Sequence, residues 1–257
     1  MRHAAIALLL LVAQDAAQKP AFEVAAIKRS ENIDAGGTLG LLPGGRFRAI
    51  NWDARALIGV AYRTRPPRTL DRSQIIGLPD WALTERYDIN AKIAAELAAT
   101  IDAPNRDPNL MPKLVQSLLE DRFKLKMHYE KRELPVYALV VVKKDGALGP
   151  RMQVSNVDCQ ADRSKCSIRG ELGFFKAGSV TMETLATTVS RPAGRLVFDH
   201  TGLTAKYDVD LEWADEAGSD KPSIFAAVQE QLGLKLEATR EPVDVVVIDR
   251  IERPAED

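Results

Sequence analysis

The chain carries one short pattern twice, first as Arg122-Phe123-Lys124-Leu125-Lys126 and then as Gln231-Leu232-Gly233-Leu234-Lys235. Each copy predicts a helix that runs into a strand with alternating apolar and polar residues. The signals around the two copies follow the same order: a capped helix, a Gly-Leu turn, a Tyr-Asp strand, a second helix and a Pro-Val turn before an apolar strand. We therefore predict an internal duplication whose copies cover residues 45–143 and 178–251.

Each half predicts a β-α-β-β-α-β-β unit, which is an α+β fold with two helices packed on a small mixed sheet. We expect a first α+β repeat over residues 21–148, a linker over 149–171 and a second repeat over 172–253. Residues 253–257 form a polar tail. The residues expected to cap helices are Asn51, Asn109, Thr181 and Ser223.

Two features of the 257-residue chain bear on its class and compartment. Its 35 basic and 36 acidic residues nearly cancel, so no overall field favours nucleic acid as a partner. Residues 1–18 begin with Met1-Arg2-His3 and continue as an apolar run from Ala4 to Ala13, which is too short to span a bilayer. This pattern predicts a signal peptide and a periplasmic or secreted protein with no transmembrane segment in the mature chain.

The two cysteines, Cys159 and Cys166, lie close together in a polar segment. In an oxidising compartment such a pair is expected to form a disulfide that closes a small loop. Two histidines far apart in the mature chain do not complete a zinc site, so we expect no metal. No Gly-rich phosphate-binding motif is present, and no cofactor is expected.

Candidate binding residues are few. Arg63, Arg65 and Arg68 surround a Pro-Pro pair and could bind an anion, although a loop of like charges is more often simply solvated. Trp81 is the tryptophan expected to be most exposed, and it could stack on a sugar or on a partner's side chain. Trp52 and Trp213 fit the edge of a core instead.

No catalytic residue is predicted. His128 lies among lysines on a polar strand face, and His200 follows Asp199 directly, which is a poor arrangement for an orienting hydrogen bond. Ser190 lacks the flanking glycines of a nucleophile elbow. Asp80, Asp88, Asp199 and Asp208 occupy matching turns or strand starts, where aspartate commonly bonds its own backbone.

Several segments together resemble a family of uncharacterised exported proteins that is expanded in soil acidobacteria. The segments are residues 22–28, 118–126, 133–141, 199–208 and 229–236. This resemblance covers nearly the whole mature chain and implies no function, since none is assigned to the family. Some relatives look like the exported portion of membrane-bound signalling peptidases of the antibiotic-sensor type.

The half from Val180 to Ile248 also resembles the short N-terminal domain of secretins and TonB-dependent receptors. The matching parts are Met182–Val189, Leu196–Asp210, Ser223–Leu232 and Val243–Ile248. That resemblance implies a protein-interaction module without catalysis.

The sequence thus predicts an exported, non-catalytic binding or protein-interaction module of the cell envelope, with signalling as one form of that role. Its expected partner is an envelope protein, contacted through exposed sheet edges or between the two lobes. Two alternatives stay open. One is an envelope hydrolase with a site between the lobes, and the other is a carbohydrate-binding protein that uses Trp81 and the arginine loop.

Overall fold

The fold is described from a computed structural model. It covers residues 19–31, 36–64, 68–101, 107–143, 146–159, 161, 163–171, 173–215 and 220–257. The expected signal peptide lies outside these residues. The chain forms two compact units, the first comprising residues up to His128 together with Val246–Asp257, and the second Tyr129–Val245. Both combine strands with fewer helices, which confirms the α+β class.

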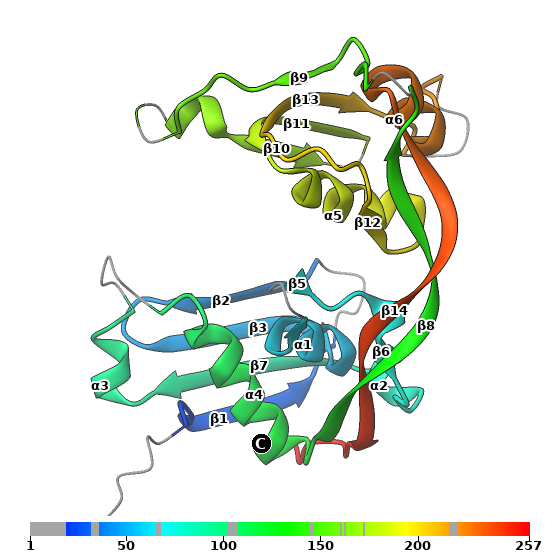
Figure 1. Cartoon of the computed structure of the whole chain (residues 1–257). Coiled ribbons are helices and arrows are strands. Elements are labelled where there is room, and N and C mark those ends of the chain that lie inside the picture. The colour runs from blue at the N-terminus through cyan, green and yellow to red at the C-terminus, as the bar shows by residue number, and fades with distance from the viewer. Residues whose placement is uncertain are drawn as a thin grey trace, which may run out of the picture. The chain divides into compact units, whose positions relative to one another are not determined.

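The first unit contains a four-stranded antiparallel sheet with the order β1-β7-β3-β2 (Figure 1). Its strands are β1 (Phe22–Arg29), β2 (Thr38–Leu42), β3 (Arg46–Asp53) and β7 (Arg86–Ile93). Two longer helices, α1 (Ala54–Ala61) and α4 (Leu110–Arg122), pack together against the sheet. The short elements are β4 (Arg63–Thr64), β5 (Arg68–Thr69), η1 (Arg72–Gln74), β6 (Ile75–Ile76), α2 (Trp81–Thr84) and α3 (Ala95–Ala98).

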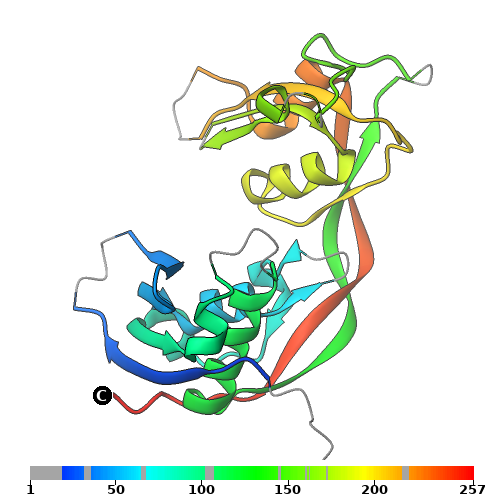
Figure 2. The same cartoon turned by 90° about the vertical axis from the view of Figure 1, so that its left-hand side faces the viewer.

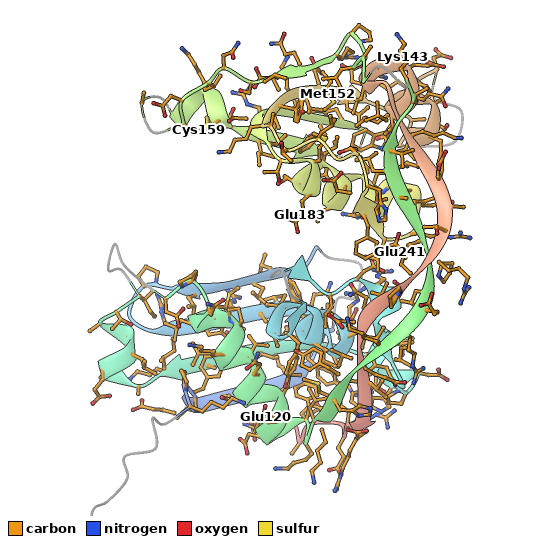
Figure 3. The ribbon with its side chains drawn as sticks, in the orientation of Figure 1. Glu120, Lys143, Met152, Cys159, Glu183 and Glu241 are labelled. Atoms are coloured by element: carbon orange, nitrogen blue, oxygen red, sulfur yellow. A yellow bond between two sulfur atoms is a disulfide. The ribbon has the colours of Figure 1, made fainter. Side chains whose placement is uncertain are left out.

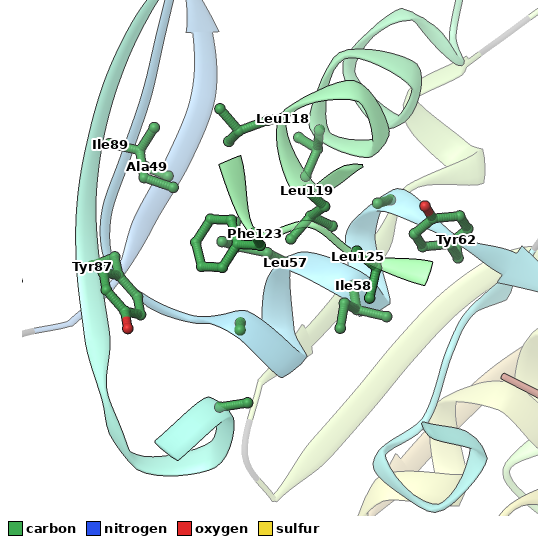
Figure 4. Close-up of a cluster of buried hydrophobic side chains, with 14 of the residues drawn as sticks. Ala49, Leu57, Ile58, Tyr62, Tyr87, Ile89, Leu118, Leu119, Phe123 and Leu125 are labelled. Carbon is green, nitrogen blue, oxygen red and sulfur yellow. The ribbon is translucent and has the colours of Figure 1, made fainter. Parts of the chain in front are cut away.

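The core of the first unit follows from the alternation of buried and exposed residues along β3 and β7. Figure 4 shows Phe123 between the sheet and α1, with its ring 5.5 Å from that of Tyr87 in an edge-on arrangement. Asp53 caps α1, because its carboxylate accepts the N–H of Ala56 at 2.7 Å. The expectation that Asn51 caps this helix was wrong: Asn51 belongs to β3 and has a left-handed φ of 62°.

The second unit has the matching sheet order β10-β11-β13-β9, also antiparallel. Its elements are β9 (Met152–Val154), η2 (Arg163–Cys166), β10 (Ile168–Glu171), β11 (Phe174–Val180), α5 (Met182–Ala193), β12 (Val197–Asp199), β13 (Tyr207–Glu212) and α6 (Ile224–Leu232). Thr181 and Ser223 cap α5 and α6 through their hydroxyl groups, as predicted. Asn109 is the N-cap residue of α4 but makes no capping side-chain hydrogen bond.

Two long strands, β8 (Lys126–Val141) and β14 (Leu234–Arg250), are neighbours in a further sheet with the order β12-β8-β14-β6 (Figure 1 and Figure 2). The Pro-Val turns expected at Pro135 and Pro242 were wrong, since both strands continue through these prolines. Proline fixes φ near −65° and disfavours helix for the residue before it, and both restrictions are compatible with extended chain.

Each long strand also pairs with one short strand: β8 with β12, and β14 with β6. β8 follows α4 of the first unit, and its residues 137–139 pair in parallel with β12 of the second. β14 follows α6 of the second unit, and its residues 246 and 247 pair in parallel with β6 of the first. The chain therefore changes unit inside both strands.

Both unit sheets thread their strands in the same chain order, which supports the proposed internal duplication without establishing it. Residues 152–154 and 168–171, within the segment expected to be a linker, form β9 and β10. The C-terminal residues expected to be a polar tail lie against the first unit: Arg122 binds the Asp257 carboxylate, and the Asp257 N–H donates to the carbonyl of Ile27.

Candidate functional site

The sheet of the second unit has one face covered by α5 and α6, and within the described residues the short helix η2 lies against part of the other face. Along β11, Phe175 and Ala177 are buried against α5 and α6, so the intervening Lys176 and Gly178 point to the opposite face. A pocket of about 750 Å³ lies on that opposite face. We call it the basic pocket, since Arg151, Lys165, Arg169 and Lys176 line it with Asp208 and Asp210.

Most charges on the floor of the basic pocket compensate one another. Arg151 donates from Nη2 to Asp210 Oδ1 at 2.8 Å and to Glu212 Oε1 at 3.1 Å, and Lys176 Nζ lies 3.1 Å from Asp210 Oδ2. Burial lowers the pKa of Arg151, but the two carboxylates outweigh it and the pKa is raised. Among the described residues, none forms an ion pair with Arg169, whose side chain is exposed.

Asp208 supports the backbone of β11. Its Oδ1 accepts the N–H of Ser179, which has a left-handed φ of 58°, at 3.0 Å. Burial raises the pKa of Asp208, but hydrogen bonds from Ser155 and Ser179 outweigh burial and lower it overall. Asp88 has the same role in the first unit, because its Oδ1 accepts the N–H of Asn51 at 3.0 Å. These carboxylates therefore stabilise strand irregularities, and their oxygens already accept backbone N–H groups.

The disulfide loop covers one end of the basic pocket. Cys159 and Cys166 form a disulfide, and Figure 3 labels Cys159 in this loop and Met152 on β9. A side chain at Gly178 would overlap the carbonyl oxygen of Lys165, so glycine at this position lets the loop lie on the sheet. The loop leads directly into β10, whose position it helps to fix.

A second hollow of about 1080 Å³ lies beside β10, and we call it the edge groove. It is bounded by β10, β11, the end of α5 and the segment after β13. Its lining combines apolar side chains (Ile168, Phe174, Phe175, Pro192 and Trp213) with the charged Glu171, Arg191 and Asp215. Phe175 and Trp213 are buried, whereas 57% of the surface of Ile168 is exposed. The groove therefore combines an apolar floor with an exposed apolar side chain at its rim.

Among the described residues, no strand pairs with the outer edge of β10, which ends the order β10-β11-β13-β9. The N–H of Gly178 donates to the carbonyl of Ser167, which makes these opposite residues a hydrogen-bonded pair. Hydrogen-bonded and non-hydrogen-bonded pairs alternate in antiparallel sheets. Ile168 and Gly170 therefore direct their N–H and C=O groups away from β11.

The predicted binding residues do not meet at either hollow. Trp81 is half-buried on the core of the first unit, and the guanidinium of Arg253 lies 5.2 Å from its ring centre. Arg63 and Arg68 belong to β4 and β5, but their side chains lie outside the description, as does the whole of Arg65.

The residues considered for catalysis have separate partners. His128 Nδ1 lies 3.0 Å from Asp249 Oδ1, and His200 Nε2 lies 3.0 Å from Glu241 Oε1. The Ser190 hydroxyl donates to the carbonyl of Ala186 within its own helix. Within the described ranges, no group of three or more His, Cys, Asp or Glu side chains is placed to hold a metal ion.

The shifted pKa values all move away from neutrality, so the carboxylates stay ionised and the tyrosines and arginines stay protonated at neutral pH. They are lowered at Glu85, Asp107 and Asp208 and raised at Tyr87, Tyr129, Arg151 and Arg253. The principal cause is a hydrogen bond from Arg253 at Glu85 and burial at the tyrosines. None of these groups is poised for proton transfer near pH 7.

Sequence reasoning missed the edge groove, because β10 falls in the segment expected to be a linker. The available signal was the short run Ile168-Arg169-Gly170-Glu171, in which uncharged residues alternate with charged ones. Four residues are too few for periodicity alone to indicate a strand.

Residues 55–251, most of the chain, match the family model described as "Protein of unknown function (DUF3738)". The chain belongs to this family. Both hollows lie within the matched residues, so they are part of the DUF3738 region. No curated protein and no solved structure matches the chain. No helix in the described ranges is long and apolar enough to cross a membrane.

Proposed function

We propose that this protein is an exported, non-catalytic protein-interaction module of the cell envelope, to which a partner adds an extended segment along β10. One observation carries the proposal: within the described ranges the outer edge of β10 has no paired strand, and it directly borders the edge groove. An edge strand offers backbone hydrogen bonds to any added strand, and an adjacent pocket gives the choice of partner its specificity.

The composition of the edge is consistent with a binding role. Proteins commonly protect edge strands with charge, proline, a bulge or a covering element. Here Arg169 and Glu171 are charged: Arg169 lies opposite Lys176 on the face of the basic pocket, whereas Glu171 at the end of β10 also lines the edge groove. On the groove side, Ile168 is exposed and Gly170 has no side chain. The side of β10 that borders the groove thus keeps its apolar surface accessible.

The titratable groups support binding rather than proton-transfer chemistry. Every resolved pKa shift in the described ranges stabilises the usual charge state, and the carboxylates on the sheet face are engaged by Arg151, Lys176 or backbone N–H groups. Trp81, the residue considered for sugar stacking, already has Arg253 over its ring. No observation favours the hydrolase or carbohydrate alternatives over protein binding.

The disulfide fits an oxidising compartment, as the predicted signal peptide does. We therefore place the protein in the periplasm or outside the cell as part of the proposal. The resemblance of residues 180–248 to the short N-terminal domain of secretins and TonB-dependent receptors also supports an interaction role.

The test is site-specific photo-cross-linking with the full chain. A photoreactive residue replaces Ile168, and the purified protein is exposed to envelope extract from the producing organism. A reproducible adduct is expected, and it should vanish when Gly170→Pro removes an outward N–H. Gly170→Ala keeps that N–H, and its methyl group would lie 3.4 Å from Phe175 Cδ2, an acceptable contact, so it should keep the adduct.

The matched control places the same photoreactive residue at Val154, an exposed position on β9 at the opposite edge of the sheet. Equal labelling from Ile168 and Val154, or adducts that survive Gly170→Pro, would count against the proposal. Circular dichroism and thermal unfolding of the two Gly170 variants establish that both are folded.

A further inference from the structure

We propose that the segment added to β10 carries an acidic side chain opposite Arg169, a large apolar or aromatic one opposite Gly170, and no acidic one opposite Glu171. This inference rests on the proposed function and assigns the chemistry of the partner. It follows from three properties of β10: the face on which each side chain lies, the floor of the edge groove and the row of charges across the sheet.

Side chains of directly opposite residues lie on the same face of a sheet. Ile168 and Gly170 lie opposite the buried Ala177 and Phe175, so both are on the helix-covered face that borders the groove. Arg169 lies opposite Lys176, on the face of the basic pocket. An added strand must have the same alternation, with every second side chain in the groove.

On the groove side, Gly170 leaves an opening in the row of side chains, next to the buried ring of Phe175. The ideal position of a β-carbon at Gly170 is 3.4 Å from Phe175 Cδ2, so the Phe175 ring lies directly beside the missing side chain. Trp213 and Pro192 extend the apolar lining. A large residue opposite an edge glycine can cover such an opening, because a cross-strand aromatic side chain packs over the glycine. We therefore assign an aromatic or large aliphatic residue to this position.

On the other face, one cross-strand row runs from Arg169 through Lys176 to Asp210. Lys176 is compensated by Asp210 at 3.1 Å, which in turn is held by Arg151 at 2.8 Å. Arg169 stands next to Lys176, a like charge, and in the described part of the chain it has no ion-pair partner. Opposite charges on neighbouring strands attract, and like charges repel. An acidic residue on the added strand would complete the row.

A second copy of this chain is the competing occupant. A two-fold antiparallel pairing of β10 with itself, centred on Arg169, would set two like charges opposite each other. In the pairing centred on Gly170, Arg169 would face Glu171 of the other copy, but Gly170 would face Gly170. That arrangement leaves the opening next to Phe175 unfilled. The groove is therefore better matched to a different protein segment.

The experiment measures binding of short labelled peptides to the full chain by fluorescence anisotropy. One peptide has a central phenylalanine with glutamate on one side, to lie opposite Arg169, and threonine on the other, to lie opposite Glu171. Its comparison peptide has threonine in place of the glutamate. The glutamate peptide should bind more tightly, and Arg169→Glu should reverse the preference, each change being about fivefold. Arg169→Gln, which removes the charge alone, should leave little preference.

The outcomes separate this inference from the proposed function. If Ile168 still cross-links an envelope protein in a Gly170-dependent manner but Arg169→Glu leaves the peptide preference unchanged, the acidic assignment is wrong and the interaction module stands. Tight binding of both peptides to Gly170→Pro overturns strand addition. A dimer of the free protein that Gly170→Pro dissolves assigns β10 to a second copy and overturns the inference.

Discussion

Gly178→Ala should destabilise the second unit by pushing the disulfide loop off the sheet. A β-carbon at this position would overlap the carbonyl oxygen of Lys165 and lie 3.2 Å from its carbonyl carbon. Both are backbone atoms, which cannot rotate away as a side chain could. Overpacking of this kind costs about 1–3 kcal/mol. The hydrogen bond from the Gly178 N–H to Ser167, at 3.4 Å, should be lost as the loop moves.

The assay is urea denaturation followed by circular dichroism and tryptophan fluorescence. The same substitution is measured with the disulfide removed by Cys159→Ser and Cys166→Ser, where the loop can move more freely. Gly178→Ala should then lower the free energy of unfolding by about 1 kcal/mol less than it does with the disulfide intact. This difference is the coupling energy between Gly178 and the disulfide.

Gly40→Ala in β2 is the matched control, because a β-carbon there would have no neighbour within 4 Å. It should leave the free energy of unfolding unchanged or raise it by up to about 1 kcal/mol. Equal losses for Gly178→Ala with and without the disulfide would refute the reasoning, as would a loss no larger than that of the control.

Three further predictions concern stability. Arg253 lowers the pKa of Glu85, so the Glu85 carboxylate stabilises the folded state above its unfolded pKa. This stabilisation is lost as the pH falls through the folded pKa. In Glu85→Gln, the free energy of unfolding should therefore decrease less steeply at acid pH. Replacing Cys159 and Cys166 together by serine should cost about 2–3 kcal/mol, and added reductant should then have no further effect on the urea midpoint. Phe123→Ala should cost about 3–5 kcal/mol in urea unfolding, because the ring is fully buried and leaves a cavity.

Much of the secondary structure was readable from local signals. The alternation after Phe123 correctly indicated a strand, and Thr181 and Ser223 were recognised as helix caps. The signals failed where two local preferences compete. Pro135 was taken as a turn because proline is common in turns, whereas its fixed φ also fits the middle of an extended strand.

The candidate site was largely beyond sequence reasoning. Arg169 looked like one charge among many in a polar segment. Its significance comes from Lys176 opposite it and from the lack of an ion-pair partner in the described part of the chain. Gly178 gave no sign that a loop lies against it. Trp81 was expected to be exposed, but it packs on the first unit's core beneath Arg253.

The amino-acid pattern alone was enough to predict the α+β class and the positions of several helix caps, because these depend on periodicity and on neighbours within a turn. Folding in three dimensions settled which strands pair: β14 lies beside β6, and β8 lies beside β12. It also left β10 at an edge beside an apolar groove. Pairing depends on contacts between residues far apart in the chain, and the energies of those contacts leave little trace in a local window of sequence.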